Sequence, residues 1–246
     1  MLNKNVIIKD KYTRKKKKDN NKDSTMNIFF LWIVSNYVNN AKSLCDKHVV
    51  KMILETTQML YAVQYRYSTE FDQDGKPIVP RCIFDALPMI EKKVRDKETR
   101  KMRKCPVKAT PYKRTHRNHP MTLWVGSNIK HYNHAIQLAL AMGKVYSQRY
   151  KNKRHACMDH IEILKQFPPE ELTRISENLQ EQDPPQCMPD EYKIPKDYVA
   201  AYRNYYINEK MKTFVDKNMF RYAIEDHKPD FIKIEEHNYV SLKEKQ

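Results

Sequence analysis

The strongest hydrophobic pattern in the chain lies in residues 45–63. Apolar and weakly polar residues recur there at the i, i+3, i+4, i+7 spacing of a buried helix face; they are Val49, Met52, Ile53, Thr56, Met59, Leu60 and Val63. The pattern predicts a core helix over residues 41–67. His48 and Glu55 project from one side of this helix about two turns apart. An imidazole and a carboxylate on an apolar stripe are costly to bury unless they are paired or reactive.

Similar spacing predicts further helices elsewhere in the chain. They cover residues 121–150, residues 154–166, a segment from residue 168 onward and residues 196–215. Gly126 is expected to divide the first of them, with Ser127 capping the second half. Residues 27–34 form a short apolar run, which predicts a buried strand or core segment. Residues 91–104 are almost all charged and predict a solvated helix.

Glycine content favours a helical fold. Only three glycines occur among 246 residues, whereas about 7% is average, and all-β folds and glycine-rich phosphate loops need more of them. We therefore expect an all-α protein with a short strand-like segment near its N-terminus. Residues 1–25 lack an apolar pattern and are expected to form a disordered basic tail. Residues 26–246 are expected to form a single helical domain with a long basic insertion at 68–110.

Positive charge is concentrated in two segments of the chain. The formal net charge is +16 at pH 7; residues 1–25 hold nine lysines and arginines against three aspartates, and residues 91–117 hold twelve against three acids. Concentrated positive charge favours a polyanionic partner, and DNA is a stronger expectation than RNA. A solubilising tail and a solvated loop would explain the same charges without a partner.

Cysteine usage and hydrophobicity bear on location. The five cysteines are widely spaced and contain no CxxC pair, which favours a reduced, intracellular protein. No apolar run approaches the roughly 18–20 residues that span a bilayer, so no membrane partner is expected. The run Arg14–Lys18 (RKKKK) has the composition of a nuclear-localisation signal. The sequence does not indicate an oligomeric state.

The densest chemistry lies in residues 108–120. Its basic and imidazole side chains belong to Lys113, Arg114, His116, Arg117 and His119. They directly precede Pro120, which suits the first turn of a helix, and we predict that they bind phosphates. A second predicted nucleic-acid contact consists of Tyr202, Arg203 and Tyr206, because tyrosine rings stack on bases. Packing of these tyrosines in the core is the alternative.

Other chemistry fits parts of the same pattern. Close pairs of potential zinc ligands are Cys45 with His48, His116 with His119, and Cys157 with His160. A thiol nucleophile at Cys45, served by one of the histidines of residues 116–119, is another alternative. In a purely structural interpretation Glu55 pairs with Lys51, and His48 is a hydrogen-bonded histidine at the core edge. We expect neither a metal nor another cofactor.

Three blocks of the sequence resemble a known family. They are Cys45–Met52 (CDKHVVKM), Tyr112–Pro120 (YKRTHRNHP) with Trp124 four residues on, and Met188–Lys193 (MPDEYK) with Ala201–Tyr206 (AYRNYY). The blocks are distributed over most of residues 26–231. They are similar to a family of small phage and large-DNA-virus proteins, some of them described as related to pyrimidine-dimer DNA glycosylases of the endonuclease V type.

The resemblance implies an all-helical DNA repair enzyme. Enzymes of that class attack the sugar C1′ beside a damaged pyrimidine with an amine, form a Schiff base, and use a glutamate to direct glycosylic and strand cleavage. Their nucleophile is the amino terminus after removal of methionine; here Asn27 follows Met26. The resemblance places Glu55 in a position comparable to the glutamate. It also implies the host cytoplasm or nucleus, or a virion, as the location.

These observations together predict a DNA-binding repair or processing enzyme, a DNA glycosylase or AP lyase acting on damaged pyrimidines. Glu55 and His48 are the expected acid–base groups at the sugar, and Lys51 is the expected amine nucleophile. The alternatives are a non-catalytic basic nucleic-acid-binding accessory protein of the virion or nucleus, and a zinc-stabilised binding module.

Overall fold

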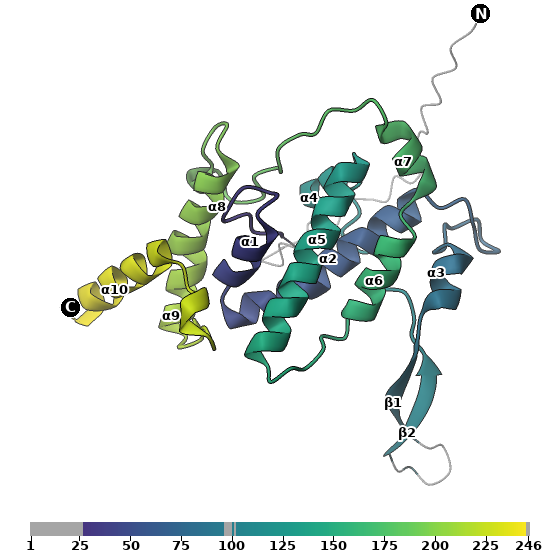
Figure 1. Ribbon diagram of the computed structural model, residues 1–246, viewed down its shortest axis with the longest axis horizontal. Helices are drawn as coiled ribbons and strands as arrows, with labels where there is room; N and C mark the ends of the chain where they lie inside the picture. Colours follow the sequence, from purple (N-terminus) through teal and green to yellow (C-terminus); the bar gives the residue numbers. More distant parts are fainter. Residues whose placement is uncertain (1–26, 96–99, 101, 245–246) are drawn as a thin grey trace, which may run out of the picture.

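Helices α2 and α5 lie against each other at the centre of the protein (Figure 1). The computed structural model describes residues 27–95, 100 and 102–244. α2 spans Asp46–Arg66 and α5 spans Ile129–Arg149. The helices packed around this pair are α1 (Tyr37–Ser43), α4 (Pro120–Val125), α6 (Met158–Gln166) and α7 (Glu170–Ser176). The described part of the chain is thus a mostly helical single domain, as the sequence predicts.

The C-terminal helices form a second group beside this pair (Figure 1). Its elements are α8 (Tyr198–Tyr205), a π-helical segment (Tyr206–Met211), α9 (Lys212–Asp216) and α10 (Asp230–Glu244). Short 3₁₀ turns occupy Asp190–Tyr192 and Glu225–His227. The helix predicted over 196–215 is therefore present, with a π-helical segment in its middle.

The buried face predicted for residues 49–63 is confirmed. All seven residues of the apolar pattern are buried on α2. The predicted helix over 41–67 is nevertheless two helices, because Leu44 and Cys45 adopt extended backbone angles, with ψ of 135° and 162°. α2 therefore begins at Asp46, and α1 packs separately against α5.

Gly126 divides α4 from α5, as predicted. A Cβ at this position would lie 3.1 Å from both Arg66 Nη1 and Val63 Cγ2, so the close approach to α2 favours glycine. The cap of α5 is Asn128 rather than Ser127: its side-chain oxygen accepts the Lys130 N–H at 2.9 Å. Asparagine is among the strongest N-cap residues, which explains why it takes this position.

Residues 27–31 are buried, as predicted, whereas Trp32 and Val34 are half-buried and Ile33 is exposed, and the segment forms no strand. Phe30 and Leu31 are fully buried, and the ring of Phe29 packs on those of His48 and Tyr206. In a sheet, a partner strand would form the hydrogen bonds of this backbone; here side chains form them. Glu55 accepts the N–H of Asn27, Asn40 that of Trp32, and Tyr198 that of Val34, while Arg203 donates to the carbonyl of Leu31. A buried backbone can therefore cross the core without a sheet.

The prediction of an all-α fold is wrong in the basic insertion. β1 (Met89–Arg95) and β2 (Met102–Lys108) form an antiparallel hairpin where we expected a solvated helix, preceded by the short helix α3 (Arg81–Ala86). The residues Ile90, Lys92 and Val94 alternate with their neighbours across the two faces of the ribbon, which is the period of a strand. The density of charge in this segment obscures that period.

Two other predictions concern the ends of the chain and the membrane. The predicted disordered tail, residues 1–25, lies outside the described residues. Within the described residues, the helices are too short or too polar to traverse a lipid bilayer.

Candidate functional site

Glu55 lies in the middle of α2, and both of its carboxylate oxygens have partners. Oε1 forms an ion pair with Lys51 Nζ at 3.2 Å, one helical turn away, and Oε2 accepts the backbone N–H of Asn27 at 3.0 Å. The Glu55 side chain is 10% exposed, whereas that of Lys51 is 55% exposed. The structure therefore joins a buried carboxylate to an amine that reaches solvent.

Burial governs the protonation of this carboxylate. Desolvation raises the pKa of Glu55 above its ordinary value, and the Asn27 N–H, the charge of Lys51 and that of His116 partly oppose this rise. A carboxyl with a raised pKa is a stronger base once ionised and a better proton donor near neutral pH. The environment of Glu55 is thus suited to exchanging protons.

The charge of a residue in the basic loop between β2 and α4 acts on the same carboxylate. The exposed members of this loop are Lys113, Arg114, His116 and Arg117. His116 lies close enough to influence the pKa of Glu55, and it has a left-handed backbone with φ of 50°. Arg66 of α2 donates to the carbonyl of Arg117 at 2.7 Å, which ties the loop to the helix that carries Glu55.

His119 ends the loop as the N-cap of α4. Its Nδ1 accepts the Met121 N–H at 3.2 Å, so the ring is held by the helix that follows. Burial and the neighbouring His116 lower the pKa of His119. The ring therefore favours the neutral form, in which the other nitrogen is a hydrogen-bond donor toward a ligand.

A hollow of about 430 Å³ lies beside Lys51. Its lining includes Lys51 and Leu54 from α2 together with the rings of Tyr112, Tyr150 and His155. Ligand sites have volumes of a few hundred Å³ and combine apolar walls with few polar groups. Lys51 thus belongs to the wall of an aromatic hollow, and its amine pairs with Glu55, which does not line the hollow itself.

His48 lies on the same side of α2 as Glu55, about two turns earlier, and has different contacts. Its Nδ1 is 2.8 Å from the hydroxyl of Tyr206, which also accepts the Cys45 N–H at 2.9 Å, and its ring packs on Phe29 and Phe214. Burial lowers the pKa of His48 to about 3. The imidazole is therefore neutral at physiological pH and is held as a core group.

The second predicted nucleic-acid contact lies inside the protein. Tyr202 and Tyr206 are fully buried, and Tyr202 donates to the Pro185 carbonyl at 2.8 Å. The Arg203 guanidinium lies 4.6 Å from the ring centres of both Trp32 and Phe231. As arranged here, the two tyrosines have no ring face open to a base, and they support the segment that contacts Glu55.

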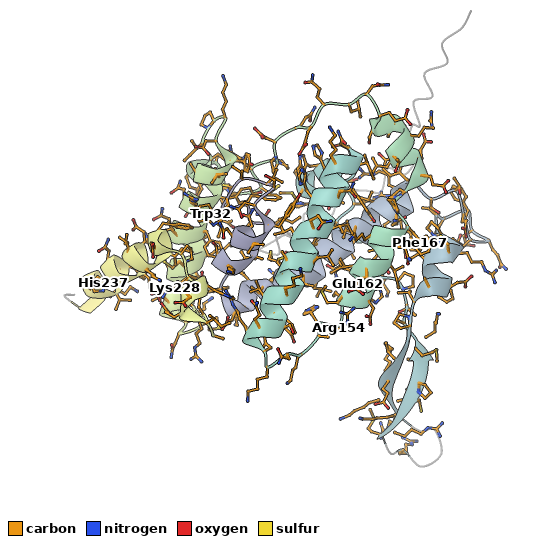
Figure 2. All side chains as sticks on the ribbon, viewed as in Figure 1. Trp32, Arg154, Glu162, Phe167, Lys228 and His237 are labelled. Atoms are coloured by element: carbon orange, nitrogen blue, oxygen red, sulfur yellow. The ribbon has the colours of Figure 1, made fainter. Side chains whose placement is uncertain are left out.

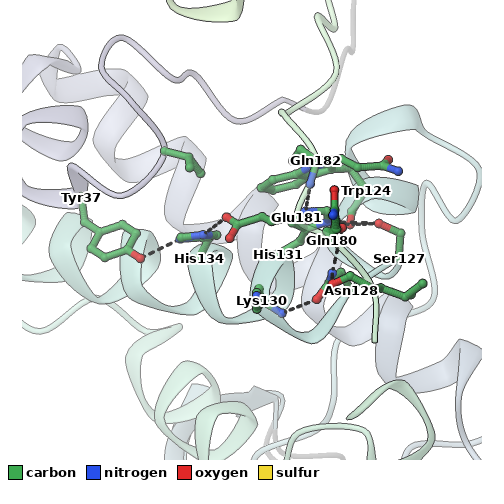
Figure 3. Close-up of polar contacts among 12 residues, drawn as sticks. Tyr37, Trp124, Ser127, Asn128, Lys130, His131, His134, Gln180, Glu181 and Gln182 are labelled. Atoms are coloured by element: carbon green, nitrogen blue, oxygen red, sulfur yellow. Dashed lines mark hydrogen bonds and ion pairs between the residues drawn. The ribbon is translucent and has the colours of Figure 1, made fainter. Parts of the chain in front are cut away.

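Residues 177–189 form the connection that follows α7 and leads toward the helix that carries Tyr202. Gln182 N–H donates to His131 Nε2 at 3.0 Å, and the Trp124 ring stacks on His131 with ring centres 4.3 Å apart (Figure 3). His134 lies between the Tyr37 hydroxyl, 2.7 Å away, and the Glu181 carboxylate. Near the end of the segment, the carbonyl of Cys187 accepts the Asn27 side-chain amide at 2.7 Å. The segment therefore helps to fix Asn27 at Glu55.

The chain was compared with protein-family models, with curated proteins and with solved structures. None of the three comparisons finds a match.

The alternative chemistries find less support in the geometry. Cys45 is fully buried beside Tyr206, and burial raises the pKa of its thiol, which disfavours the reactive thiolate. Within residues 27–95, 100 and 102–244, no three histidine, cysteine, aspartate or glutamate side chains gather in a way that would hold a metal ion.

Sequence reasoning missed two parts of the site. The N–H of Asn27 reaches Glu55 across 28 residues of chain, and no local pattern indicates such a contact. The hollow combines α2 with Tyr112, Tyr150 and His155 from distant segments. A partial signal did exist, because Lys47, Lys51 and Leu54 repeat at helical spacing and mark the side of α2 that faces the hollow.

Proposed function

We propose that this protein is a DNA-binding repair or processing enzyme of the glycosylase and AP-lyase kind. The observation that carries the proposal is the Lys51–Glu55 pair, with Nζ and Oε1 3.2 Å apart and with Lys51 in the wall of the aromatic hollow. An amine next to a proton-accepting carboxylate is the arrangement that Schiff-base formation with a sugar aldehyde requires. The sequence resemblance points to the same class.

The hollow has the properties that an extruded nucleotide needs. Enzymes that act on a base or its sugar take the nucleotide out of the helix and hold it between aromatic or apolar side chains. Tyr112 and Tyr150 offer rings at the walls of the hollow, and Lys51 offers the amine. A nucleotide placed there would bring its sugar toward Lys51.

The chemistry begins with proton transfer from the Lys51 ammonium to Glu55. The free amine attacks C1′ of the open-chain sugar at an abasic site, and the adduct loses water with a proton returned by Glu55, which leaves a protonated Schiff base. Glu55 then removes a C2′ proton, and the 3′ phosphate departs by β-elimination. Water hydrolyses the Schiff base and restores Lys51. On an intact nucleotide the same attack would break the C1′–N bond, and the departing base would take up a proton.

The basic loop is assigned to phosphate binding. Lys113, Arg114 and Arg117 are exposed on a loop that Arg66 anchors to α2, and His116 lies near Glu55. Contacts of this kind make DNA affinity fall as the salt concentration rises. In this proposal the loop holds the strand while α2 carries the reacting groups.

The test is borohydride trapping on labelled DNA that contains an abasic site or a pyrimidine dimer. We expect a covalent adduct that maps to Lys51, and we expect Lys51→Arg to abolish it because a guanidinium is not nucleophilic. Glu55→Gln should slow strand cleavage about 10²–10⁴-fold, the usual contribution of acid–base catalysis, with unchanged DNA affinity. Glu235→Gln, on the exposed face of α10, is the matched control and should cleave like the parent protein.

Other outcomes would change the proposal in defined ways. An adduct on a different amine would keep the lyase chemistry and remove Lys51 from the scheme. A preparation whose first residue is Asn27 would present an α-amine at the nitrogen that now contacts Glu55, and gain of an adduct only in that form would identify this amine instead. Unchanged cleavage by Glu55→Gln would remove Glu55.

A non-catalytic nucleic-acid-binding role is the second candidate. It is favoured by the same contacts, since both oxygens of Glu55 already have partners within the protein. In that case the protein would bind DNA in a salt-sensitive manner without an adduct or cleavage, and Glu55→Gln would change only the melting temperature. Both proposals include a location in the host cytoplasm or nucleus, or in a virion.

A further inference from the structure

The β1–β2 hairpin has little packing on the helical body. Figures 1 and 2 show it projecting from the helices, with its side chains extending into open space. Every residue of β1 is exposed, and the two strands contact chiefly each other. An isolated two-stranded hairpin is only marginally stable in water. A projecting ribbon of this kind is better suited to contact a partner than to support the fold.

Both faces of the hairpin carry an excess of positive charge: Lys92 and Arg103 lie on one face, and the other face holds more lysines and arginines. The strand register places Glu91, Lys93, Arg95, Lys104 and Lys108 on this second, more basic face. Lys93 stands directly opposite Lys104, and like charges in opposite positions destabilise a sheet. Glu91 forms an ion pair with Lys104 at 3.2 Å, which leaves this face with an excess of cations. A polyanion bound here would relieve the repulsion between Lys93 and Lys104.

The shape of the hairpin selects among polyanions. The major groove of B-form DNA is about 12 Å wide and admits a two-stranded β-ribbon, whose basic side chains then reach the flanking phosphates. The major groove of an RNA duplex is too narrow and deep for side chains to read. The more basic face of the hairpin therefore fits duplex DNA better than duplex RNA.

The base of the hairpin is fixed relative to the candidate site. The Ala109 N–H donates to the Pro88 carbonyl at 2.9 Å, and Ala109 is buried. Tyr112, three residues on, packs its ring near Tyr61 of α2 and also lines the hollow beside Lys51. A duplex held by the hairpin would therefore lie at a defined position relative to Lys51 and Glu55.

We infer that the β1–β2 hairpin is a duplex-binding arm that lies in the major groove of B-form DNA beside the candidate site. The inference rests on the DNA-binding function proposed above and adds the structural class of the partner. Lys93, Arg95 and Lys104 contact phosphates, and the helical body holds the arm at its base.

The test compares two triple variants that remove the same charge. The arm variant carries Lys93→Gln, Arg95→Gln and Lys104→Gln; the control variant carries Lys153→Gln, Lys165→Gln and Lys217→Gln, which are exposed on the helical body. Affinity for an undamaged DNA duplex and for an RNA duplex of the same sequence is measured by fluorescence anisotropy between about 50 and 200 mM salt. Thermal unfolding confirms that each variant folds.

We expect the arm variant to reduce the slope of log affinity against log salt by about 2–3 on the DNA duplex, close to 0.9 for each phosphate that the arm no longer neutralises. The control variant should change this slope by less than about 1, and neither variant should change binding to the RNA duplex. The inference would be refuted if both variants reduced the salt slope equally, or if the arm variant reduced it equally on DNA and on RNA. It would also be refuted if the parent protein did not bind the DNA duplex.

The test of the arm and the test of the proposed enzyme activity can fail independently. Borohydride trapping on a single-stranded abasic oligonucleotide tests Lys51 and Glu55 without a major groove. Trapping with no effect of the arm variant on duplex affinity would refute the arm alone. A salt-slope change in the arm variant without trapping on either DNA form would refute the lyase chemistry alone.

Discussion

The surroundings of Glu55 and the β1–β2 hairpin place charged groups in opposite ways: one buries and pairs a charge, and the other exposes like charges side by side. Glu55 is buried, and its oxygens are held by Lys51 and by the backbone of Asn27. In the hairpin, Lys93 and Lys104 face each other at the surface of a ribbon that packs chiefly on itself. The core thus fixes the groups proposed to react, whereas the arm presents groups proposed to bind. Changes in one region should affect stability and chemistry, and changes in the other should affect affinity.

The largest expected difference comes from truncating one apolar side chain in each region. Phe30 is fully buried between the rings of Trp124 and Tyr202, whereas Val94 in the hairpin is 37% exposed. Phe30→Ala should lower the free energy of unfolding by about 3–5 kcal/mol, and Val94→Ala by less than about 0.5 kcal/mol. Urea unfolding followed by circular dichroism measures both. Similar decreases would mean that the hairpin belongs to the cooperative core.

Acid should destabilise the core through His48, whose folded-state pKa is about 3. Because the unfolded state titrates near 6.5, it binds the proton first as the pH falls. The contribution of neutral His48 to the free energy of unfolding is therefore fully present above about pH 6.5. It is lost at about 1.4 kcal/mol per pH unit as the pH falls toward the folded-state pKa. Thermal unfolding between about pH 7 and 5 should show this slope, reduced in His48→Asn, which can retain a hydrogen bond to Tyr206. An unchanged slope in the variant would show that His48 does not cause it.

Removing the amine of Lys51 should have a smaller effect on stability. The Lys51–Glu55 pair joins residues one turn apart, and Lys51 is largely exposed, so its loss should cost about 0.3–0.5 kcal/mol. Lys51→Met should also raise the pKa of Glu55 further, since the charge of Lys51 lowers that pKa. Carboxyl NMR titration measures this rise. A fall in the pKa would contradict the electrostatic role given to Lys51.

Excising the hairpin should change stability least. The Pro88 carbonyl and the Ala109 N–H already form a hydrogen bond at its base, so a two-residue Asn-Gly turn can replace residues 89–108. We expect the melting temperature to stay within about 2 °C of the parent value. A decrease beyond about 6 °C would show that the hairpin stabilises the helices.

The sequence predicts the parts of this structure that depend on local periodicity. The buried face of α2 and the break at Gly126 follow from the spacing of apolar residues and from one missing Cβ. The contact between Asn27 and Glu55 depends on how the whole chain packs, so it leaves no local pattern. The hairpin was missed because its strands are highly charged and exposed, and burial is what usually reveals a strand.

The hydrogen bond from Asn27 to Glu55 has a consequence for protein engineering. The nitrogen that donates it is also the atom through which every preceding residue is attached. A fluorophore, affinity handle or fused domain joined close before Asn27 would therefore start at the carboxylate and compete with any ligand there. Single-molecule or imaging probes are better attached after α10, which packs on α9 and on the π-helical segment.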